Sequence, residues 1–187
     1  MPEVRVVVSG IPGVGKSTVL EYLRKKTDYE IINFGTLMYE MAKDIGLIKS
    51  RDEIRKLPID TQINLQKKAS AAIGKMENVV IDTHMTIKTP DGYMPGMPEW
   101  VIREIKCSAY FVIEADPESI LKRRTVDGTR SRDSESLQDI IEHQSFNRSF
   151  VAACSLYTGA TVMLVKNEEG KAELAAHNIV HRLMKNA

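Results

Sequence analysis

Residues 10–17 of the chain read Gly-Ile-Pro-Gly-Val-Gly-Lys-Ser, which fits the pattern G-x-x-x-x-G-K-[ST] without a gap. In this pattern the glycines let several backbone N–H groups point at one anion, the lysine adds a charge to the outer phosphates, and the serine hydroxyl is a ligand for Mg²⁺. An apolar run precedes the pattern (Val4–Ser9) and a helical stretch follows it (Thr18–Lys26), which is the setting of a phosphate-binding loop rather than a chance glycine turn. The sequence therefore predicts a site for a nucleoside triphosphate.

A carboxylate ends another apolar run, because Val79-Val80-Ile81 is followed by Asp82 and then Thr83. Asp82 can hold Mg²⁺ through water; the alternative is that it caps a helix or turn, and we favour the metal role. ATP-driven motors usually place a glutamate directly after this aspartate to activate water, so Thr83 argues against a motor. GTPases normally carry Asn-Lys-x-Asp after a strand, and Lys166-Asn167-Glu168 does not fit that pattern.

Four arginines flank one short polar segment: Arg123, Arg124, Arg130 and Arg132. A guanidinium bonds two phosphate oxygens at once, and phosphoryl transfer is catalysed mainly by positioning and charge neutralisation. The cluster therefore favours a kinase with a lid that folds over the phosphates and excludes water. Taken alone, the segment would be a solvated basic turn paired with Asp127 and Asp133, but the phosphate-binding loop favours the lid.

The elements that must position these residues are visible as short apolar runs that alternate with helical patterns. The strand candidates are Val4–Ser9, Glu30–Phe34, Asn78–Asp82, Ala109–Glu114 and Thr161–Val165. This alternation predicts an α/β P-loop NTPase fold, a five-stranded parallel sheet with helices on both faces. Ligands of such sheets bind beyond the carboxyl ends of the strands, and all five ends here carry polar or loop-forming residues.

Prolines and apolar periodicity predict the helices. Asp116-Pro117, Pro58 and Pro98 suit helix starts, and helices are also expected over 136–154 and near 171–184. In the 136–154 helix, the side chains expected to face inward are Leu137, Ile140, Ile141 and Phe150. Three prolines and two glycines fall within Thr86–Pro98, so we expect a loop there.

Composition narrows the class of protein. The 187 residues suffice for one domain, and 43% hydrophobic with 27% charged residues is ordinary for a soluble globular chain. The net charge of +1 gives no basic field for nucleic acid, and no apolar run is long enough for a membrane span. The chain enters a core strand at once, so we expect no signal peptide. Cys107 and Cys154 lack metal or redox spacing, which favours reduced thiols in a cytoplasmic protein.

Taken together, these motifs resemble the archaeal-type adenylate kinases, within the P-loop nucleoside monophosphate kinase family. The resemblance follows the family's order over nearly the whole chain, in the segments Val6–Ser17, Asn33–Ala42, Arg51–Leu57, Ile81–His84, Thr89–Pro98, Arg123–Asp133, Glu142–Arg148 and Thr158–Val162. It implies reversible conversion of Mg·ATP and AMP into two ADP. It also implies one kinase domain over 1–187, made of a core, a monophosphate-binding insertion at about 34–75 and a lid at about 125–135, and it implies a homotrimer.

The resemblance also assigns roles to residues. ATP binding is implied for Gly10, Ile11, Pro12, Gly13, Val14, Gly15, Lys16, Ser17, Thr18 and Arg123, catalysis for Lys16, Arg124, Arg130 and Arg132, and metal binding for Ser17 and, through water, Asp82. Arg123 is the alternative to Arg124 as the arginine that closes on the transferring group. The short lid has no cysteines, which excludes a zinc-stapled lid.

The AMP side departs from the bacterial and eukaryotic pattern. Tyr39 stands where those kinases place an arginine, and Thr83-His84-Met85-Thr86 replaces their Gly-Phe-Pro-Arg. The candidates for AMP binding are Gly35, Thr36, Arg51, Arg55, Thr83 and His84. Arg51 and Arg55, one helical turn apart, either converge on a phosphate or lie on an exposed face paired with neighbouring carboxylates. His84 either contacts AMP or is a packed structural histidine.

Two other functions stay open at this stage. One is a kinase of the same fold that acts on a different monophosphate or on a hydroxyl acceptor. The other is a nucleotide-binding regulatory or RNA-associated module that hydrolyses ATP slowly, against which the near-neutral charge and the absence of aromatic–basic RNA motifs argue.

Overall fold

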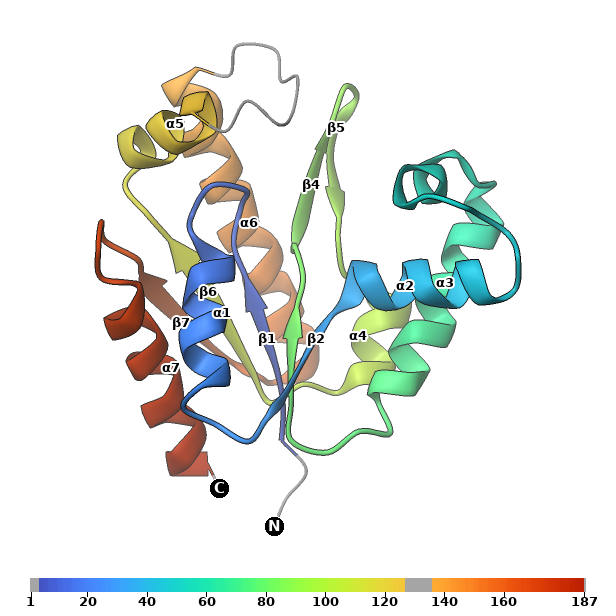
Figure 1. The fold of residues 1–187 in the computed structure, drawn as a ribbon, viewed down its shortest axis with the longest axis horizontal. Helices are drawn as coiled ribbons and strands as arrows, with labels where there is room; N and C mark the ends of the chain where they lie inside the picture. Colours follow the sequence, from blue (N-terminus) through green and yellow to red (C-terminus); the bar gives the residue numbers. More distant parts are fainter. Residues whose placement is uncertain (1–3, 127–135, 187) are drawn as a thin grey trace.

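The computed structural model describes residues 4–126 and 136–186 and contains a central five-stranded sheet, with all strand pairs parallel (Figure 1). The strand order is β2-β3-β1-β6-β7. Their bounds are β1 (Arg5–Ser9), β2 (Glu30–Asn33), β3 (Val79–Asp82), β6 (Ala109–Glu114) and β7 (Thr161–Lys166). Each predicted strand is therefore confirmed to within one residue at either end, and so is the α/β fold with a parallel sheet.

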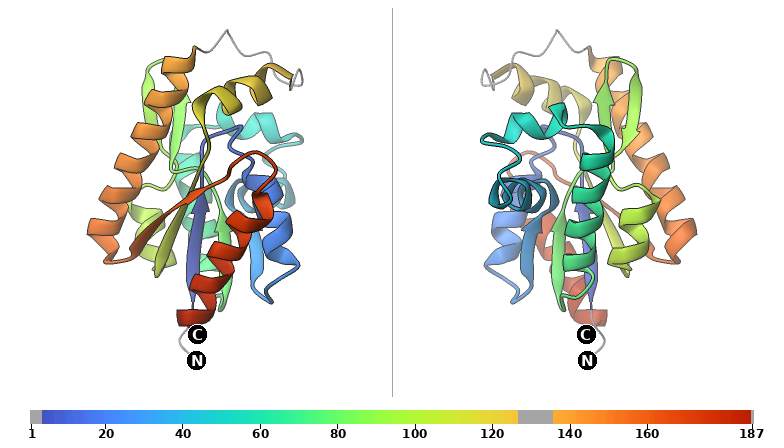
Figure 2. Two further views of the ribbon diagram at one scale, coloured as in Figure 1. Left: turned by 90° about the vertical axis from the view of Figure 1, so that its left-hand side faces the viewer. Right: turned by 90° about the vertical axis from the view of Figure 1, so that its right-hand side faces the viewer.

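Helices cover both faces of this sheet (Figure 2). Helices α1 (Lys16–Arg24) and α7 (Ala172–Asn186) pack on one face, and α3 (Ile59–Ile73), α4 (Glu99–Ile105) and α6 (Leu137–Thr158) pack on the other. The alternation of side chains along β1 explains the two layers, because Val6 and Val8 belong to the core under α1 and α7 while Val7 belongs to the other core.

Three further elements lie beside the carboxyl edge of the sheet. Helix α2 (Phe34–Asp44) begins directly after β2, the 3₁₀ helix η1 (Arg51–Lys56) joins α2 to α3, and α5 (Pro117–Val126) follows β6. Figure 1 shows α2, η1 and α3 on one side of the molecule and α5 on the other, with the loop after β1 between them. The fold thus brings residues from distant parts of the chain to the same edge of the sheet.

The segment Thr86–Pro98 is not a loop, as the sequence led us to expect, but largely a β-hairpin. Strands β4 (Thr86–Thr89) and β5 (Gly92–Pro95) pair antiparallel, and the turn uses Gly92 at φ 124°. The prolines and glycines occupy the turn and the far end of the hairpin, so they permit a two-stranded ribbon that makes no part of the main sheet.

The β4–β5 hairpin packs against α6. The ring of Tyr93 stacks on Phe146 with 4.4 Å between centroids, and its hydroxyl donates to Glu142 at 3.0 Å. Lys88 forms an ion pair with Asp139 at 2.8 Å.

On α6, Ile140 is buried but Ile141 is 42% exposed, so the expectation that Ile141 faces inward is wrong.

The two cysteines give a testable property of the core. Cys107 and Cys154 are free and buried, and burial raises the pKa of each thiol to about 11. At pH 8 only about 0.1% of such a thiol is thiolate, the reactive form. We expect a chromogenic disulfide reagent to leave the native protein unmodified at pH 8 and to titrate both thiols in denaturant. Rapid reaction of the native protein would contradict this packing.

Within the described part of the chain, no helix has both the length and the apolar character that a bilayer crossing requires.

Candidate functional site

The loop after β1 has the shape of a phosphate-binding loop. It runs from Gly10 into α1, which begins at Lys16, so the helix N-terminus follows the glycines directly. Gly13 (φ 90°) and Gly15 (φ 81°) both lie in the left-handed region, which other residues rarely adopt. A Cβ on Gly15 would also lie 2.4 Å from Nδ2 of Asn167, so this position is restricted by space as well as by backbone conformation.

Side chains from three other segments hold the carbonyl groups of this loop. The bonds run from His84 Nδ1 to Gly10 O (2.9 Å), from Arg124 Nε and Nη2 to Pro12 O (2.8 and 2.6 Å), from Arg123 Nη1 to Gly13 O (3.2 Å) and from Asn167 Nδ2 to Val14 O (2.7 Å). These bonds fix the conformation of the loop, and within it the N–H of Val14 donates to the Ile11 carbonyl at 3.4 Å. A glycine-rich loop that leads into a helix N-terminus is the setting in which backbone N–H groups bind an anion.

Lys16 and Asp82 form a close ion pair at the centre of the site. The Nζ of Lys16 also donates to the carbonyl oxygen of Thr83 at 3.0 Å. Burial lowers the pKa of Lys16, and the neighbouring Asp82 carboxylate opposes that shift. Asp82 does not cap a helix or turn, because its two oxygens accept from Lys16 and from Asn33.

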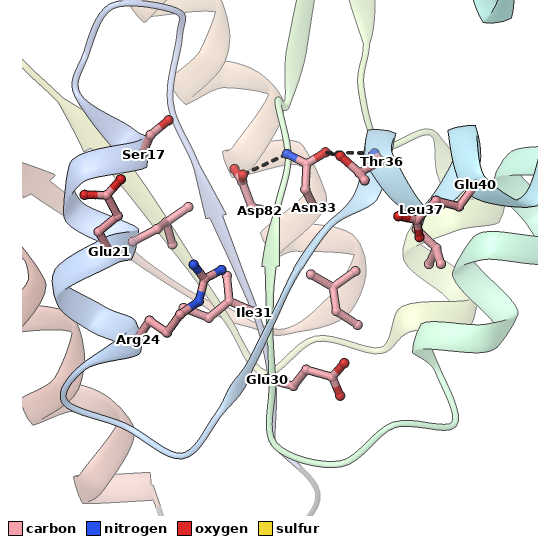
Figure 3. Close-up of a pocket in the computed structure, with 12 residues that line it drawn as sticks. Ser17, Glu21, Arg24, Glu30, Ile31, Asn33, Thr36, Leu37, Glu40 and Asp82 are labelled. Atoms are coloured by element: carbon pink, nitrogen blue, oxygen red, sulfur yellow. Dashed lines mark hydrogen bonds between the residues drawn. The ribbon is translucent and has the colours of Figure 1, made fainter. Parts of the chain in front are cut away.

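The carboxylate of Asp82 opens onto a pocket of about 490 Å³ between α1, β2 and α2 (Figure 3). Ser17 of α1 lines the same pocket, as do Asn33 and Thr36 at the start of α2. Glu21, Arg24, Glu30 and Glu40 give the pocket charged walls farther from Asp82. The structure therefore brings the two predicted oxygen ligands, Ser17 and Asp82, to one cavity.

Asn33 joins this centre to α2. Its Oδ1 accepts from the backbone N and the hydroxyl of Thr36, at 2.8 and 3.0 Å, and caps the helix. The same oxygen accepts from Nη2 of Arg51 at 3.2 Å, and Gly35 lies against that guanidinium. Of the predicted AMP residues, Gly35, Thr36 and Arg51 are thus gathered around Asn33, and Thr83 lies beside Lys16.

Of the two alternatives for Arg51 and Arg55, convergence on one point is not what the structure shows. Both lie on η1, a 3₁₀ helix with about three residues per turn, so a spacing of four separates their side chains by roughly a third of a turn. Arg55 is exposed, and within residues 4–126 and 136–186 no hydrogen bond or ion pair links it to Asn33 or Asp82. The sequence spacing was read as α-helical, and the tighter helix rotates one arginine away.

His84 lies two residues beyond the end of β3. Part of its side chain reaches solvent and part packs against the phosphate-binding loop, so it is not a histidine of the core. Loss of solvation and the charge of Lys16 lower its pKa to about 4. The ring is therefore neutral near pH 7, and because a carbonyl can only accept, Nδ1 carries the proton that goes to Gly10. In this structure His84 fastens the loop.

Arg123 and Arg124 lie in the last turn of α5 and contact the phosphate-binding loop from the side away from α2 (Figure 1). Arg123 also forms an ion pair with Glu169 at 2.5 Å in the segment after β7. Arg130 and Arg132, the other two predicted lid arginines, lie outside the described residues. Both described arginines are thus placed beside the predicted phosphate site, in agreement with the cluster expected from the sequence.

A second pocket of about 680 Å³ lies where β6 and β7 end, between α5, α6 and the segment after β7. Glu114 and Arg148 form a close ion pair on its wall, and Gln144 bonds the backbone of Ala115 with both ends of its amide. Both pockets therefore open at the carboxyl edge of the sheet, where this class of fold binds ligands.

Asn33 and Asn167 are the functional residues that sequence reasoning missed. Each follows or ends a strand and was noted only as a polar residue at a strand end. Asn167 is 4% exposed and bonds a loop residue 153 positions away in the chain. A signal was available, since a buried asparagine at the carboxyl end of a parallel strand needs partners there.

Comparison with known proteins agrees with this geometry. A protein-family model described as an AAA domain matches residues 9–141. A shikimate kinase from Acinetobacter baumannii, solved in complex with shikimate, has a TM-score of 0.67 and 14% identity over 99% of this chain and 95% of that one. A gluconokinase from Sinorhizobium meliloti 1021 has a TM-score of 0.55 and 17% identity over 98% and 95%. At these identities the likeness shows a shared fold.

Sequence relatives are much closer. A protein of Thermoplasma acidophilum named adenylate kinase is 56% identical over 176 residues, 94% of this chain and 96% of the relative. One of Methanocaldococcus jannaschii with the same name is 44% identical over 186 residues, 95% of this chain and 97% of the relative. With the phosphate-binding loop, the flanking arginines and similarity at this level over nearly its full length, the chain belongs to the adenylate kinase family.

Proposed function

We propose that this chain is a phosphotransferase that moves the γ-phosphoryl group of ATP to AMP, reversibly, to give two ADP. The relatives at 44–56% identity, all named adenylate kinase, support this assignment. The organisms from which these relatives come support the assignment to the archaeal type of adenylate kinase. The observation that carries the proposal is the position of the Lys16–Asp82 ion pair. On one side of the pair lies the phosphate-binding loop, which Arg123 and Arg124 contact. On the other side lie Asn33, Thr36 and Arg51, at the start of α2 and in η1.

The reaction asks the protein to bring two anions together, which costs repulsion. Lys16 and the backbone N–H groups of the loop bind the outer phosphates of ATP, and Thr18 adds a hydroxyl for an inner phosphate. The AMP phosphate oxygen is already a competent nucleophile, so no side chain has to act as a strong base. Catalysis then consists of orienting the two phosphates in line and neutralising the charge that spreads over the transferring group.

Mg²⁺ is the metal we propose for this site. Ser17 and Asp82 fit it, because a hydroxyl and a carboxylate face one pocket and Mg²⁺ keeps most of its waters when it binds protein. Ser17 would hold the ion directly and Asp82 through water. The ion would supply positive charge that the transferring phosphates need. Lys16, which pairs with Asp82 in the structure, is the residue whose charge we assign to the outer phosphates.

The remaining roles are proposals of the same kind. Residues 34–75, which include α2, η1 and α3, are the proposed AMP-binding insertion. The lid proposed from the sequence at about 125–135 lies outside the described residues except for its first two. Arg130 and Arg132 join Arg124 on the transferring phosphoryl group, while Arg123 binds ATP. AMP is held by Gly35, Thr36, Thr83 and Arg51, with His84 and Arg55 at its margin. Arg51 supports this best, because a guanidinium beside a helix N-terminus suits a phosphate.

Product analysis tests the function. We expect AMP to stimulate consumption of ATP severalfold with ADP as the sole product, and two adenosines bridged by five phosphates to inhibit tightly. A panel of CMP, UMP, GMP, dTMP and shikimate measures acceptor choice in the same coupled assay. Slow ATP hydrolysis that ignores AMP would overturn the proposal, and preference for another acceptor would move the chain to a different kinase activity.

A homotrimer in the cytoplasm is the setting we propose for this activity. The exposed edge strand β7 and the end of α6 support self-association, since Leu156 (89% exposed), Val162 (41%) and Leu164 (51%) form apolar surface there. The two free thiols support a reducing compartment. Light scattering on the eluted protein measures the number of subunits.

A further inference from the structure

Asn33 connects the start of α2 and η1 to Asp82, the partner of the loop lysine. It ends β2, and in the parallel pairing of β2 with β3 its Cα partner is Asp82. Both side chains therefore emerge at the same height on the carboxyl edge of the sheet. Asn33 is thus fixed by the sheet register and not by a mobile loop.

Both ends of the Asn33 amide are used, and for different partners. The Nδ2 donates to Oδ2 of Asp82 at 2.8 Å (Figure 3). The other oxygen of Asp82 accepts from Lys16. The Oδ1 accepts from Thr36 and from Arg51. One continuous chain of bonds therefore runs from η1 and the start of α2, through Asn33 and Asp82, to the lysine of the phosphate-binding loop.

No common substitute reproduces this arrangement. Serine keeps an oxygen that caps α2, but it is too short to donate to Asp82 at the same time. Aspartate keeps the cap and loses the donor, and it places a second carboxylate against Asp82. The amide is required because it donates on one side and accepts on the other.

We propose that Asn33 is a positioning residue that acts through Asp82: it holds the carboxylate at the angle from which it serves Lys16 and the phosphates, and it ties that carboxylate to the first turn of α2. This inference rests on the proposed function for its catalytic consequence. The structural part, that Asn33 and Asp82 are energetically coupled, stands apart from the function.

The first test is kinetic and uses Asn33→Ser, Asp82→Ala and the double variant, since alanine removes both oxygens that Asn33 and Lys16 bond. Asn33→Ser should lower kcat by about 10-fold or more while the KM values for ATP and AMP change by less than about threefold. In the Asp82→Ala background the same substitution should lower kcat by less than about twofold, because its route of action is already lost. Multiplicative losses would overturn the proposal.

Thr158→Ala is the matched control. Thr158 is the last residue of α6, where its hydroxyl donates to Cys154 O at 2.8 Å and accepts from Ala160 N at 3.2 Å, so this variant loses side-chain bonds to the backbone at the opposite edge of the sheet from the nucleotide site. It should lower thermal stability about as much as Asn33→Ser does and leave kcat within about twofold of the parent. An Asn33→Ser variant whose kcat falls no further than that of Thr158→Ala would reduce Asn33 to a cap and overturn the proposal.

The second test needs no activity. Urea unfolding of the parent, both single variants and the double variant, without metal or nucleotide, measures the coupling between the two side chains. The midpoint shift of the double variant should be clearly smaller than the sum of the single shifts, and additive shifts would refute the coupling. If the parent showed no AMP-dependent ADP formation, the proposed function would fail while this cycle still decided whether Asn33 holds Asp82.

Discussion

Replacing Lys16 with alanine is expected to lower kcat by a factor on the order of 10³, the largest loss we expect from any single substitution in this chain. Lys16 is the cation closest to Asp82 in the described site, and its neighbours show that it can serve two partners. In the structure Lys16 pairs with Asp82. With ATP bound, its charge is needed on the outer phosphates while charge builds on the transferring group.

The measurement is initial-rate ADP formation at saturating ATP and AMP, with binding of ATP followed separately by calorimetry. Stability has to be followed too, since Lys16→Ala leaves Asp82 without its cationic partner. Arg103→Ala is a suitable control, because Arg103 makes exposed contacts outside the site, an ion pair with Glu99 and a hydrogen bond to Tyr157 at 3.4 Å, and its loss should change turnover very little. Parent-like turnover in folded Lys16→Ala would remove the loop lysine from the mechanism.

The second large effect is expected at Arg124, where alanine should reduce kcat by about 10²-fold or more. Its guanidinium bonds the Pro12 carbonyl through two nitrogens, so it already lies at the wall of the phosphate site. Arg123→Ala should instead raise the KM for ATP by about 10-fold with a smaller change in kcat, because Arg123 is anchored between Gly13 and Glu169.

The two alanine variants are matched, since they remove the same group from adjacent positions of one helix. Arg124→Lys adds a further distinction: it keeps the charge and loses the planar fork, so most of the kcat loss should remain. If Arg123→Ala lowered kcat and Arg124→Ala raised only the KM, the assignment of the two arginines would have to be exchanged. Equal effects of both on the KM alone would argue that neither acts on the transferring group.

Much of the fold follows from local patterns. The runs that became β1, β3 and β6 are apolar on both faces, as buried parallel strands must be, and prolines begin α5 and precede α3 and α4. The phosphate-binding loop was recognisable because all of its parts are contiguous in sequence. Local signals sufficed wherever the determining contacts lay within one element and its immediate neighbours.

The remainder depended on contacts between distant residues. Asn33 meets Asp82 only because β2 pairs with β3 in one register, and Asn167 reaches Val14 only because β7 ends beside the loop. The prolines and glycines of Thr86–Pro98 predicted a loop, so the β4–β5 hairpin was not expected. The hairpin is stabilised by the ring of Tyr93, which stacks on Phe146 of α6. The different directions of Arg51 and Arg55 could not be predicted without knowing that their segment is a 3₁₀ helix.

The fastened carbonyls of the loop bear on how ATP binds. Side chains of four residues, His84, Arg123, Arg124 and Asn167, bond the carbonyl groups of the loop and restrict its backbone. We therefore expect little backbone entropy to be lost when the triphosphate binds. Association of ATP with this half of the site should then resemble docking to a rigid receptor, with a modest heat-capacity change. Most of the conformational entropy lost during the catalytic cycle would then be lost by the segments that close over the nucleotides. Their closure excludes water during phosphoryl transfer.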